Sequence, residues 1–206
     1  MSFRTIRLEA DARGIATVTL DRPEKHHAID AAMIAELTEA AAALGADPSV
    51  RAVVLAATGS SFCAGGDLDW MRAQAAADRA GKIAEAGRLS AMLAALNALP
   101  KPLIGRVQGN VYGGGVGLVA VCDLAIAAEG IRLALSEICA PEALDERVDR
   151  AAEAVLKAAP GAVAAAKALC LGLGADQAAD IARSIAALAD RWESDEAQGR
   201  IRAFLE

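Results

Sequence analysis

Two glycine-rich stretches and one glutamate are the parts of this chain whose residue types best suit chemistry. In the second stretch, three consecutive glycines, Gly113–Gly115, stand between a β-type run at 102–107 and an apolar run at 116–121 that is typical of a buried helix. The backbone must therefore turn sharply where a helix begins, and glycine leaves the first amides of that helix open to a ligand. Free N–H groups at the positive end of a helix dipole suit an anionic oxygen. A phosphate oxygen and the enolate-like oxygen of an activated thioester both fit.

The first glycine-rich stretch is Thr58–Asp67, TGSSFCAGGD, which follows a short apolar run at 50–57. Asp67 directly precedes a predicted helix, so we interpret it as a helix cap rather than a reacting group. The glutamate is Glu137, which stands among leucine and isoleucine residues in the run LALSEI. A poorly solvated carboxyl group has a raised pKa, which favours a role as general acid and base.

Composition excludes several classes of function. The chain has 206 residues, is 55% hydrophobic and carries a formal net charge of -6, which disfavours nucleic acid as a main partner. Its four cysteines have no CxxC spacing, and its two histidines are adjacent, so we expect no metal site and no histidine-based nucleophile triad. The first residues, MSFRTIRLEAD, contain no apolar run typical of a signal peptide, and no apolar run reaches the roughly 18 residues of a membrane span, so we expect neither export nor membrane insertion. We therefore expect a cytoplasmic protein with buried, reduced thiols.

The order of predicted elements indicates an α/β core followed by a helical tail. A β-hairpin is predicted over 3–9 and 15–20, and Asp30 is the predicted N-cap of the first helix. Strand, helix and strand then imply a right-handed parallel crossover. The remaining predicted strands are 50–57, 103–107, 124–128 and 131–135, and the remaining helices are 68–99, 142–158, 161–171, 176–192 and 195–205.

Several of these motifs, in this order, resemble the crotonase family of enoyl-CoA hydratases and isomerases. They are FCAGGDLDWM at 62–71, QGNVYGGGVGLVAVCDLAIAA at 108–128 and LALSEI at 133–138. DRPEKHHAID at 21–30 is similar to the family's opening CoA-contact loop. The resemblance implies an α/β fold, a spiral of ββα units over 1–138, with a C-terminal helical trimerisation region over 139–206. It also implies a homo-oligomer, either a trimer or a dimer of trimers.

The resemblance further implies a site. The N–H groups of Gly66 and Gly114 would hold the thioester oxygen of an acyl-CoA, and Glu137 would carry the proton. The family position of a first glutamate is Gly117 here, so that carboxylate is absent. Coenzyme A enters as part of the substrate, and no separate cofactor is implied. The residues implied to contact the substrate or its CoA moiety are Lys25, His26, Ala28, Ala64, Gly66, Leu68, Trp70, Tyr112 and Gly113.

A single glutamate leaves alternative functions open. We favour hydration of a 2-enoyl-CoA, because YGGGVGLVAVCD is similar to bacterial methylglutaconyl-CoA and isohexenylglutaconyl-CoA hydratases. The alternative within enzymes is a double-bond isomerase, since family isomerases typically keep only the second glutamate. The alternative from another class is a non-catalytic CoA-binding paralogue.

The chain departs from the family pattern after Ile138. A segment that normally contributes two helices is absent, and Cys139 already begins the part that resembles the family's tail. Loss of about fifty residues would expose apolar faces that must otherwise be covered. We therefore expect the numbering to pass over a segment between residues 138 and 139, and the alternative is a true deletion.

Overall fold

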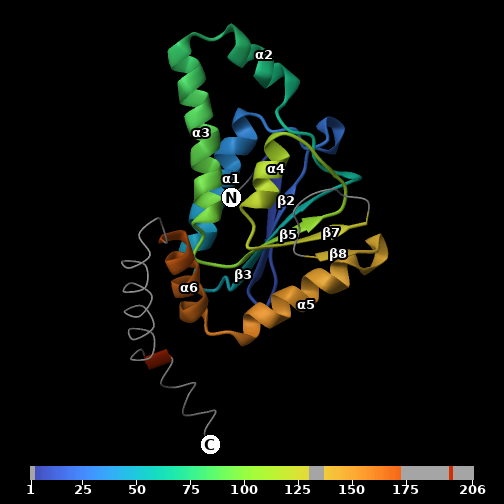
Figure 1. Cartoon of the computed structure of the whole chain (residues 1–206), viewed down its shortest axis with the longest axis vertical. Helices are drawn as coiled ribbons and strands as arrows, with labels where there is room; N and C mark the ends of the chain where they lie inside the picture. Colours follow the sequence, from blue (N-terminus) through green and yellow to red (C-terminus); the bar gives the residue numbers. More distant parts are fainter. Residues whose placement is uncertain (1–2, 130–136, 173–194, 197–206) are drawn as a thin grey trace, which may run out of the picture.

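A six-stranded sheet forms the centre of the computed structural model, which describes residues 3–129, 137–172 and 195–196 (Figure 1). The strand order is β1-β2-β3-β5-β7-β8. β1 and β2 form the predicted antiparallel hairpin, and every other neighbouring pair in this sheet is parallel. The strands are β1 (Ile6–Ala10), β2 (Ile15–Leu20), β3 (Ala52–Ala57), β5 (Leu103–Val107), β7 (Leu124–Ala128) and β8 (Glu137–Cys139).

Helices cover both faces of the sheet, which explains why all six residues of β3 are buried. Because side chains alternate along a strand, Val53 and Leu55 join the apolar cluster that contains residues of α1 and α3, whereas Val54 joins the one that contains residues of α5. The helices are α1 (Ala31–Ala46), α2 (Leu68–Ala76), α3 (Arg79–Asn97), α4 (Gly114–Ala120), α5 (Leu144–Lys157) and α6 (Pro160–Gly172), with 3₁₀ turns at Pro23–Lys25 and Pro141–Ala143.

The single helix predicted over 68–99 is wrong, because two helices occupy this segment. α2 ends before Ala77, and the side chain of Asp78 caps α3 by accepting a hydrogen bond from Gly81 N at 2.8 Å. The break projects α2 and the first part of α3 as an arm beyond the sheet, at the top of Figure 1. No helix within the described residues is long and apolar enough to cross a bilayer.

A second, two-stranded parallel sheet was not predicted. It pairs β4 (Ser61–Cys63) with β6 (Asn110–Val111), through Ser61 opposite Asn110 and Cys63 opposite Val111. Each strand leads into one glycine-rich turn and then into a helix, α2 after β4 and α4 after β6. This small sheet therefore brings together two turns that lie about fifty residues apart in the sequence.

β8 runs without interruption through the point at which a skipped segment was expected. Residues 137, 138 and 139 pair with consecutive residues of β7, so Ile138 and Cys139 are neighbours in this chain. The expectation that the numbering passes over a segment here is therefore wrong. The strand predicted at 131–135 and the helix at 176–192 lie outside the described residues, as does most of the helix at 195–205.

Candidate active site

The two glycine turns lie against each other at one end of the small sheet. Because β4 and β6 are parallel, their carboxyl ends share an edge, and the helices that follow begin there. A Cβ atom built on Gly65 would lie 3.1 Å from the carbonyl oxygen of Tyr112, and one on Gly113 would lie 3.5 Å from the Cα atom of Gly65. The turns are thus in van der Waals contact.

Glycine is required in these turns for two physical reasons. Gly65 and Gly113 have φ angles of 91° and 48°, the left-handed range that side chains disfavour. Gly115 is needed because of space, since a Cβ atom there would lie 2.7 Å from Cys63 Cβ. α4 therefore packs on β4 at a distance that only glycine permits.

The N–H group of Gly66 faces away from Ile29, the residue with which Gly66 is paired. Ile29 forms an isolated parallel bridge with Gly66, in which Ile29 N donates to Gly65 O at 2.7 Å and Asp67 N donates to Ile29 O at 2.8 Å. In such a bridge the flanking residues make both bonds, so the N–H and C=O of Gly66 point to the other side. Gly66 N–H is left as an available donor.

Gly114 supplies a second donor at the start of α4. The next two amides are engaged within the turn, with Gly115 N donating to Tyr112 O and Val116 N to Gly113 O. Among the described residues, neither Gly66 N–H nor Gly114 N–H has a hydrogen-bond acceptor. Two unpaired amides at adjacent helix N-termini can stabilise negative charge on an oxygen atom.

Asp67 is a helix cap, as the sequence predicts. Its Oδ1 accepts hydrogen bonds from the backbone N–H groups of Asp69 at 2.9 Å and Trp70 at 3.3 Å, and its Oδ2 lies 3.1 Å from Arg22 Nη2. Burial by itself raises the pKa of this carboxyl group, but these hydrogen bonds outweigh burial and lower the pKa overall. Asp67 is therefore ionised at neutral pH and unsuited to proton transfer.

The loop between β2 and α1 places its two histidines in different roles, although both have left-handed backbones. His27 is buried; its Nδ1 accepts from Arg22 N at 3.0 Å, so its Nε2–H donates to Thr58 O at 2.7 Å. Burial lowers the pKa of His27, with the Thr58 hydrogen bond partly offsetting it. His26 is exposed, and its Nδ1 lies 3.0 Å from Ser61 Oγ.

Three further predicted CoA-contact residues lie on or beside this loop. Lys25 is half-exposed and pairs with Asp69 of α2 at 3.3 Å. Ala28 uses its own backbone groups within the protein, since its N–H donates to Lys25 O and its C=O accepts from Arg22 Nη1. Ala64 is exposed and donates its N–H to His26 O at 2.9 Å. The structure thus brings the loop and the first glycine turn together.

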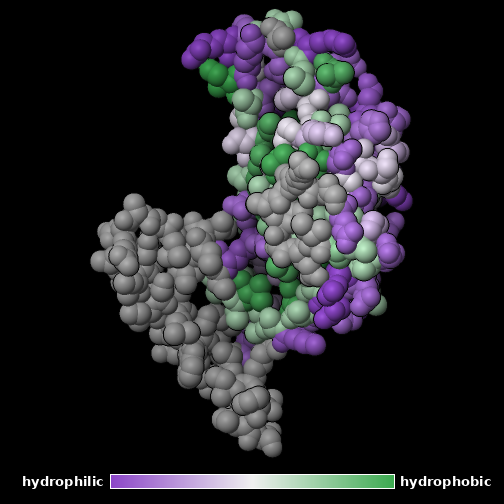
Figure 2. Space-filling model, turned by 45° about the vertical axis from the view of Figure 1, so that its right-hand side comes forward, coloured by the Kyte–Doolittle hydropathy of each residue, from purple (hydrophilic) through white to green (hydrophobic). Residues whose placement is uncertain are grey.

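Apolar side chains surround the two helix starts. Leu68 and Tyr112 are 66% and 59% exposed, which is unusual for large apolar residues and is consistent with a surface that a ligand covers. Figure 2 shows hydrophobic patches among hydrophilic residues over the upper part of the molecule. A hollow of about 400 Å³ lies between α2 and α3 and is lined by Trp70, Met71, Gln74, Lys82, Glu85, Ala86 and Leu89.

This hollow adjoins Gly66. A Cβ atom on Gly66 would lie 3.3 Å from Met71 Sδ and 3.6 Å from a ring carbon of Trp70, and both side chains also line the hollow. Trp70 is fixed there because its Nε1–H donates to Glu85 Oε2 at 3.2 Å. Trp70 was predicted from the sequence as a contact residue. The α3 residues that line the hollow were not, because the break between α2 and α3 was not predicted.

Glu137 is placed only through its backbone. It begins the edge strand β8 and pairs with Ile126 of β7, and its side chain lies outside the described part of the chain. At Gly117, a Cβ atom would lie 3.2 Å from Leu93 Cδ1 of α3. The position that carries a first glutamate in the resembled family therefore faces an apolar side chain here.

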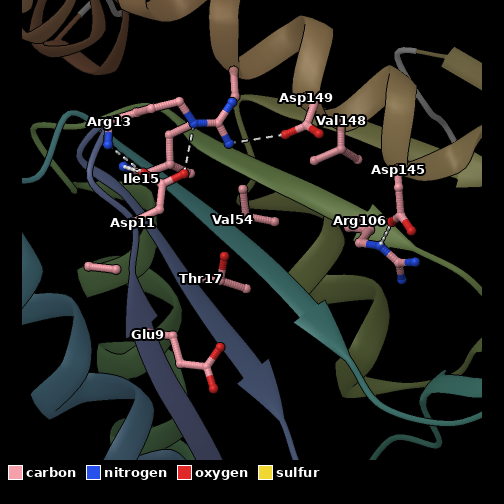
Figure 3. A pocket seen from close by; sticks show the side chains of 12 residues that line it. Glu9, Asp11, Arg13, Ile15, Thr17, Val54, Arg106, Asp145, Val148 and Asp149 are labelled. Atoms are coloured by element: carbon pink, nitrogen blue, oxygen red, sulfur yellow. Dashed lines mark hydrogen bonds and ion pairs between the residues drawn. The ribbon is translucent and has the colours of Figure 1, made fainter.

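A different hollow, of about 350 Å³, lies between α5 and the hairpin side of the sheet (Figure 3). Both of its arginines are paired with carboxylates: Arg13 pairs with Asp11 at 2.8 Å and Asp149 at 3.3 Å, and Arg106 pairs with Asp145. Neither glycine turn contributes to it. Within the described residues, no cluster of three or more His, Cys, Asp or Glu side chains could hold a metal ion.

The fold and the paired turns define an α/β protein in which two neighbouring glycine turns each leave one amide N–H without an acceptor among the described residues. This chain belongs to the enoyl-CoA hydratase/isomerase family, whose model matches residues 10–140. It is similar to a probable enoyl-CoA hydratase of Rhodobacter capsulatus, with 38% identity over 130 residues, which is 63% of this chain and 48% of that protein. It is also 36% identical over 117 residues to the probable enoyl-CoA hydratase echA6 of Mycobacterium tuberculosis, covering 57% of this chain and 44% of that protein. The chain spans about half the length of the curated relatives it matches.

Solved structures show the crotonase fold predicted from the motifs. An enoyl-CoA hydratase from Mycobacterium smegmatis matches with a TM-score of 0.91 and 30% identity, covering 98% of this chain and 96% of that one. An enoyl-CoA hydratase from Shewanella pealeana matches with a TM-score of 0.91 and 26% identity, covering 98% of this chain and 94% of that one. The overall fold is thus shared with these solved structures.

Proposed function

We propose that this protein is a hydro-lyase that adds water reversibly to a 2-enoyl-CoA. The observation that carries the proposal is the contact between two glycine turns, each of which leaves one amide N–H unpaired at the start of a helix. A thioester becomes electrophilic at its β-carbon only when negative charge on its oxygen is stabilised. Gly66 N–H and Gly114 N–H are the donors for that oxygen, and family membership supports this assignment.

Glu137 is the proposed acid and base. As water attacks C3 of the enoyl group, the carboxylate of Glu137 accepts a proton from the water, and the resulting carboxylic acid then gives this proton to C2 of the enolate held by Gly66 and Gly114. The support is the family resemblance of the LALSEI motif and the placement of Glu137 at the start of an edge strand. Asp67, the carboxylate next to the first glycine turn, is engaged as a helix cap and in the pair with Arg22, so it does not compete with Glu137 for the role of acid and base.

The CoA moiety is proposed to lie along the loop from Lys25 to Ala28 and the first glycine turn. Lys25 supplies a positive charge for a phosphate, and the exposed His26 supplies a ring nitrogen. Ala64, Gly66 and Leu68 surround the adenine ring in this proposal, and Gly113 with Tyr112 lies beside the thioester. The His26–Ala64 hydrogen bond supports this placement, because it holds the two CoA-contact segments together.

The acyl group is proposed to enter the hollow between α2 and α3, which adjoins Gly66 through Trp70 and Met71. Lys82 lines this hollow and has no ion-pair partner among the described residues. A cation at the rim of a mainly apolar hollow favours an acyl group that ends in a carboxylate, as in methylglutaconyl-CoA. Replacing Lys82 by Met should lower kcat/KM for such a substrate about tenfold and leave crotonyl-CoA unaffected. Equal effects on the two substrates would contradict this assignment.

The decisive experiment compares hydration of crotonyl-CoA by the wild type, Glu137→Gln and Glu142→Gln. Glu142 is an exposed glutamate on the following 3₁₀ turn and serves as the matched control. We expect loss of about 10²- to 10⁴-fold in kcat for Glu137→Gln, the usual contribution of a general acid–base group, and little change for the control. A wild type that binds CoA thioesters without hydrating them would instead support the non-catalytic paralogue.

Double-bond isomerisation is the second candidate, and the environment of Gly117 favours it. Residue 117 is glycine and Leu93 faces it, so the site lacks the first family glutamate. A hydration mechanism that uses two carboxylates would depend on that glutamate. Incubation with a 3-enoyl-CoA separates the reactions: an isomerase gives the 2-enoyl product without prior hydration. Accumulation of the 3-hydroxyacyl product from the 2-enoyl substrate supports the hydratase.

We also propose, from the family resemblance, that the protein assembles as a trimer or a dimer of trimers. α5 packs on the sheet through Leu144, Val148 and Ala152, while α6 continues past its edge. Analytical ultracentrifugation tests this proposal, and a monomeric species at micromolar concentration would contradict it.

A further inference from the structure

Arg22 joins the starts of two helices that flank the candidate site. Its Nη1 lies 2.9 Å from Asp30 Oδ2 and donates to Ala28 O at 2.7 Å, while its Nη2 lies 3.1 Å from Asp67 Oδ2. The side chain of Arg22 is 14% exposed and that of Asp67 is 5% exposed. This is a largely desolvated, three-way network of charge-assisted hydrogen bonds, so removing one partner would leave the others uncompensated in a poorly solvated place.

Both carboxylates in the network also cap helices. Asp30 Oδ1 accepts from Met33 N at 2.8 Å at the start of α1, and Asp67 Oδ1 accepts from Asp69 N at 2.9 Å at the start of α2. In each aspartate, one oxygen serves the helix and the other serves Arg22. A shift of the guanidinium group is therefore transmitted to both helix starts.

Gly66 lies between two segments that Arg22 contacts, the segment around Ile29 and Asp67. On one side, Ile29 clamps the peptide groups around Gly66 through the bonds from Ile29 N to Gly65 O and from Asp67 N to Ile29 O. Ile29 itself is flanked by Ala28 and Asp30, both of which Arg22 contacts. On the other side, Asp67 is held by Arg22 Nη2. The segments on both sides of Gly66 are thus held by one largely buried side chain, that of Arg22.

We propose that Arg22 is a positioning residue that aligns Gly66 N–H with the thioester oxygen during turnover, an inference that rests on the proposed function. An effective oxyanion donor lies about 2.7–3.1 Å from the oxygen, a range only about 0.4 Å wide. A misplacement of about 1 Å at a reacting centre can lower the rate about 10²-fold. Arg22 therefore contributes to kcat through geometry, not through contact with substrate.

The substitution Arg22→Lys separates the geometry of the guanidinium group from its positive charge. An ammonium group keeps the positive charge but lacks the planar fork that reaches Asp30, Ala28 and Asp67 together. We expect Arg22→Lys to lower kcat for crotonyl-CoA about 10- to 100-fold and to change KM less than about threefold. Arg13→Lys is the matched control, because Arg13 forms its ion pairs beside α5 with Asp11 and Asp149.

A spectroscopic readout distinguishes alignment from general loss of structure. Acetoacetyl-CoA bound in an oxyanion hole ionises to its enolate, whose near-ultraviolet absorbance reports the stabilisation that the two amides supply. We expect the enolate fraction at fixed pH to fall at least tenfold in Arg22→Lys at saturating acetoacetyl-CoA, and to be unchanged in Arg13→Lys. If Arg22→Lys does not fold, Asp67→Asn replaces it, since asparagine still caps α2 but loses the charged pairing with Arg22.

The outcomes separate this inference from the proposed function. A wild type that shows neither hydration nor an enolate band overturns both, whereas an active wild type with unchanged kcat and enolate band in Arg22→Lys overturns the role of Arg22 alone. A rise in KM with unchanged kcat also overturns it, since this would make Arg22 part of the CoA-binding loop only. Loss of kcat and of the enolate band together, with KM maintained, supports it.

Discussion

Replacing Gly114 by Ala is the sharpest perturbation that the structure offers. A Cβ atom at this position would lie 3.0 Å from Ile29 Cδ1, and no other atom outside its own turn and helix lies within 4 Å. The φ angle of Gly114 is not in the left-handed range, so alanine suits the backbone. The predicted defect therefore comes from one contact with one methyl group.

The size of the defect follows from that contact. Carbon atoms normally pack at about 3.5–4.0 Å, so the new methyl group overlaps Ile29 by about 0.5 Å or more. Ile29 is 1% exposed, so its Cδ1 atom has little free space into which it can rotate away from the new methyl group. Overpacking of this kind costs about 1–3 kcal/mol. If this cost appears as misalignment of the two N–H donors in the transition state, the activation free energy rises by the same amount and kcat/KM decreases about 5- to 150-fold.

The assay is hydration of crotonyl-CoA, followed by the loss of enoyl-thioester absorbance, with urea unfolding measured in parallel. Ile29→Val provides the rescue, because valine lacks the Cδ1 atom that the new methyl group meets. Ile29→Val alone should cost about 0.5–1.5 kcal/mol of stability. In the double variant the clash is absent, so we expect the two substitutions to show a favourable coupling energy of about 1 kcal/mol or more.

Two results would refute this reasoning. One is a Gly114→Ala variant with wild-type kcat/KM, which would mean that Gly114 N–H does not require its present position. The other is a double variant that is no more active than Gly114→Ala, which would place the defect elsewhere than Ile29. Gly87→Ala is the control, since a Cβ atom at this exposed α3 position meets no atom within 4 Å.

Three further predictions follow from single residues. Because the pKa of His27 is lowered in the folded state, the unfolded chain takes up a proton first as pH falls through about 6.5. The free energy of unfolding is therefore retained above this pH and decreases below it, and urea titrations from pH 5 to 8 should show a weaker decrease in His27→Asn. Partial burial, reinforced by the negative charge of Asp123, raises the pKa of Cys122 to about 12, so iodoacetamide at pH 8 should label this thiol much faster in unfolded than in native protein; equal labelling rates in the two states would contradict this environment. Gly113→Ala should cost about 1–3 kcal/mol, because φ is 48° there, and a variant as stable as Gly87→Ala would show that the turn adopts another conformation.

Much of the main fold could be predicted because its signals are local. Alternating β-branched residues predicted the hairpin, and a continuous apolar run predicted β3 as a strand covered on both faces. Asp30 and Asp67 were predicted as helix caps, and both accept the backbone hydrogen bonds that define a cap. Each of these features depends on residues within a few positions of one another.

The missed features have weak local signals. β4 and β6 have only three and two residues, too few to show any hydrophobic period. The break at Ala77 and Asp78 was missed because alanine and charged residues continue a helical pattern on both sides. The paired glycine turns were expected from the family motifs, whereas their contact depends on the unpredicted β4–β6 pairing.

The sequence by itself determined which residue types are available: glycines that free backbone amides, aspartates that cap helices, and one glutamate in an apolar run. Only the tertiary structure decided which of them meet. Arg22 and Asp67 are 45 residues apart and belong to no common motif, yet a desolvated ion pair joins them. The reason is physical: propensity and periodicity act along the chain, whereas the alignment of Gly66 depends on charges that folding brings together from distant segments.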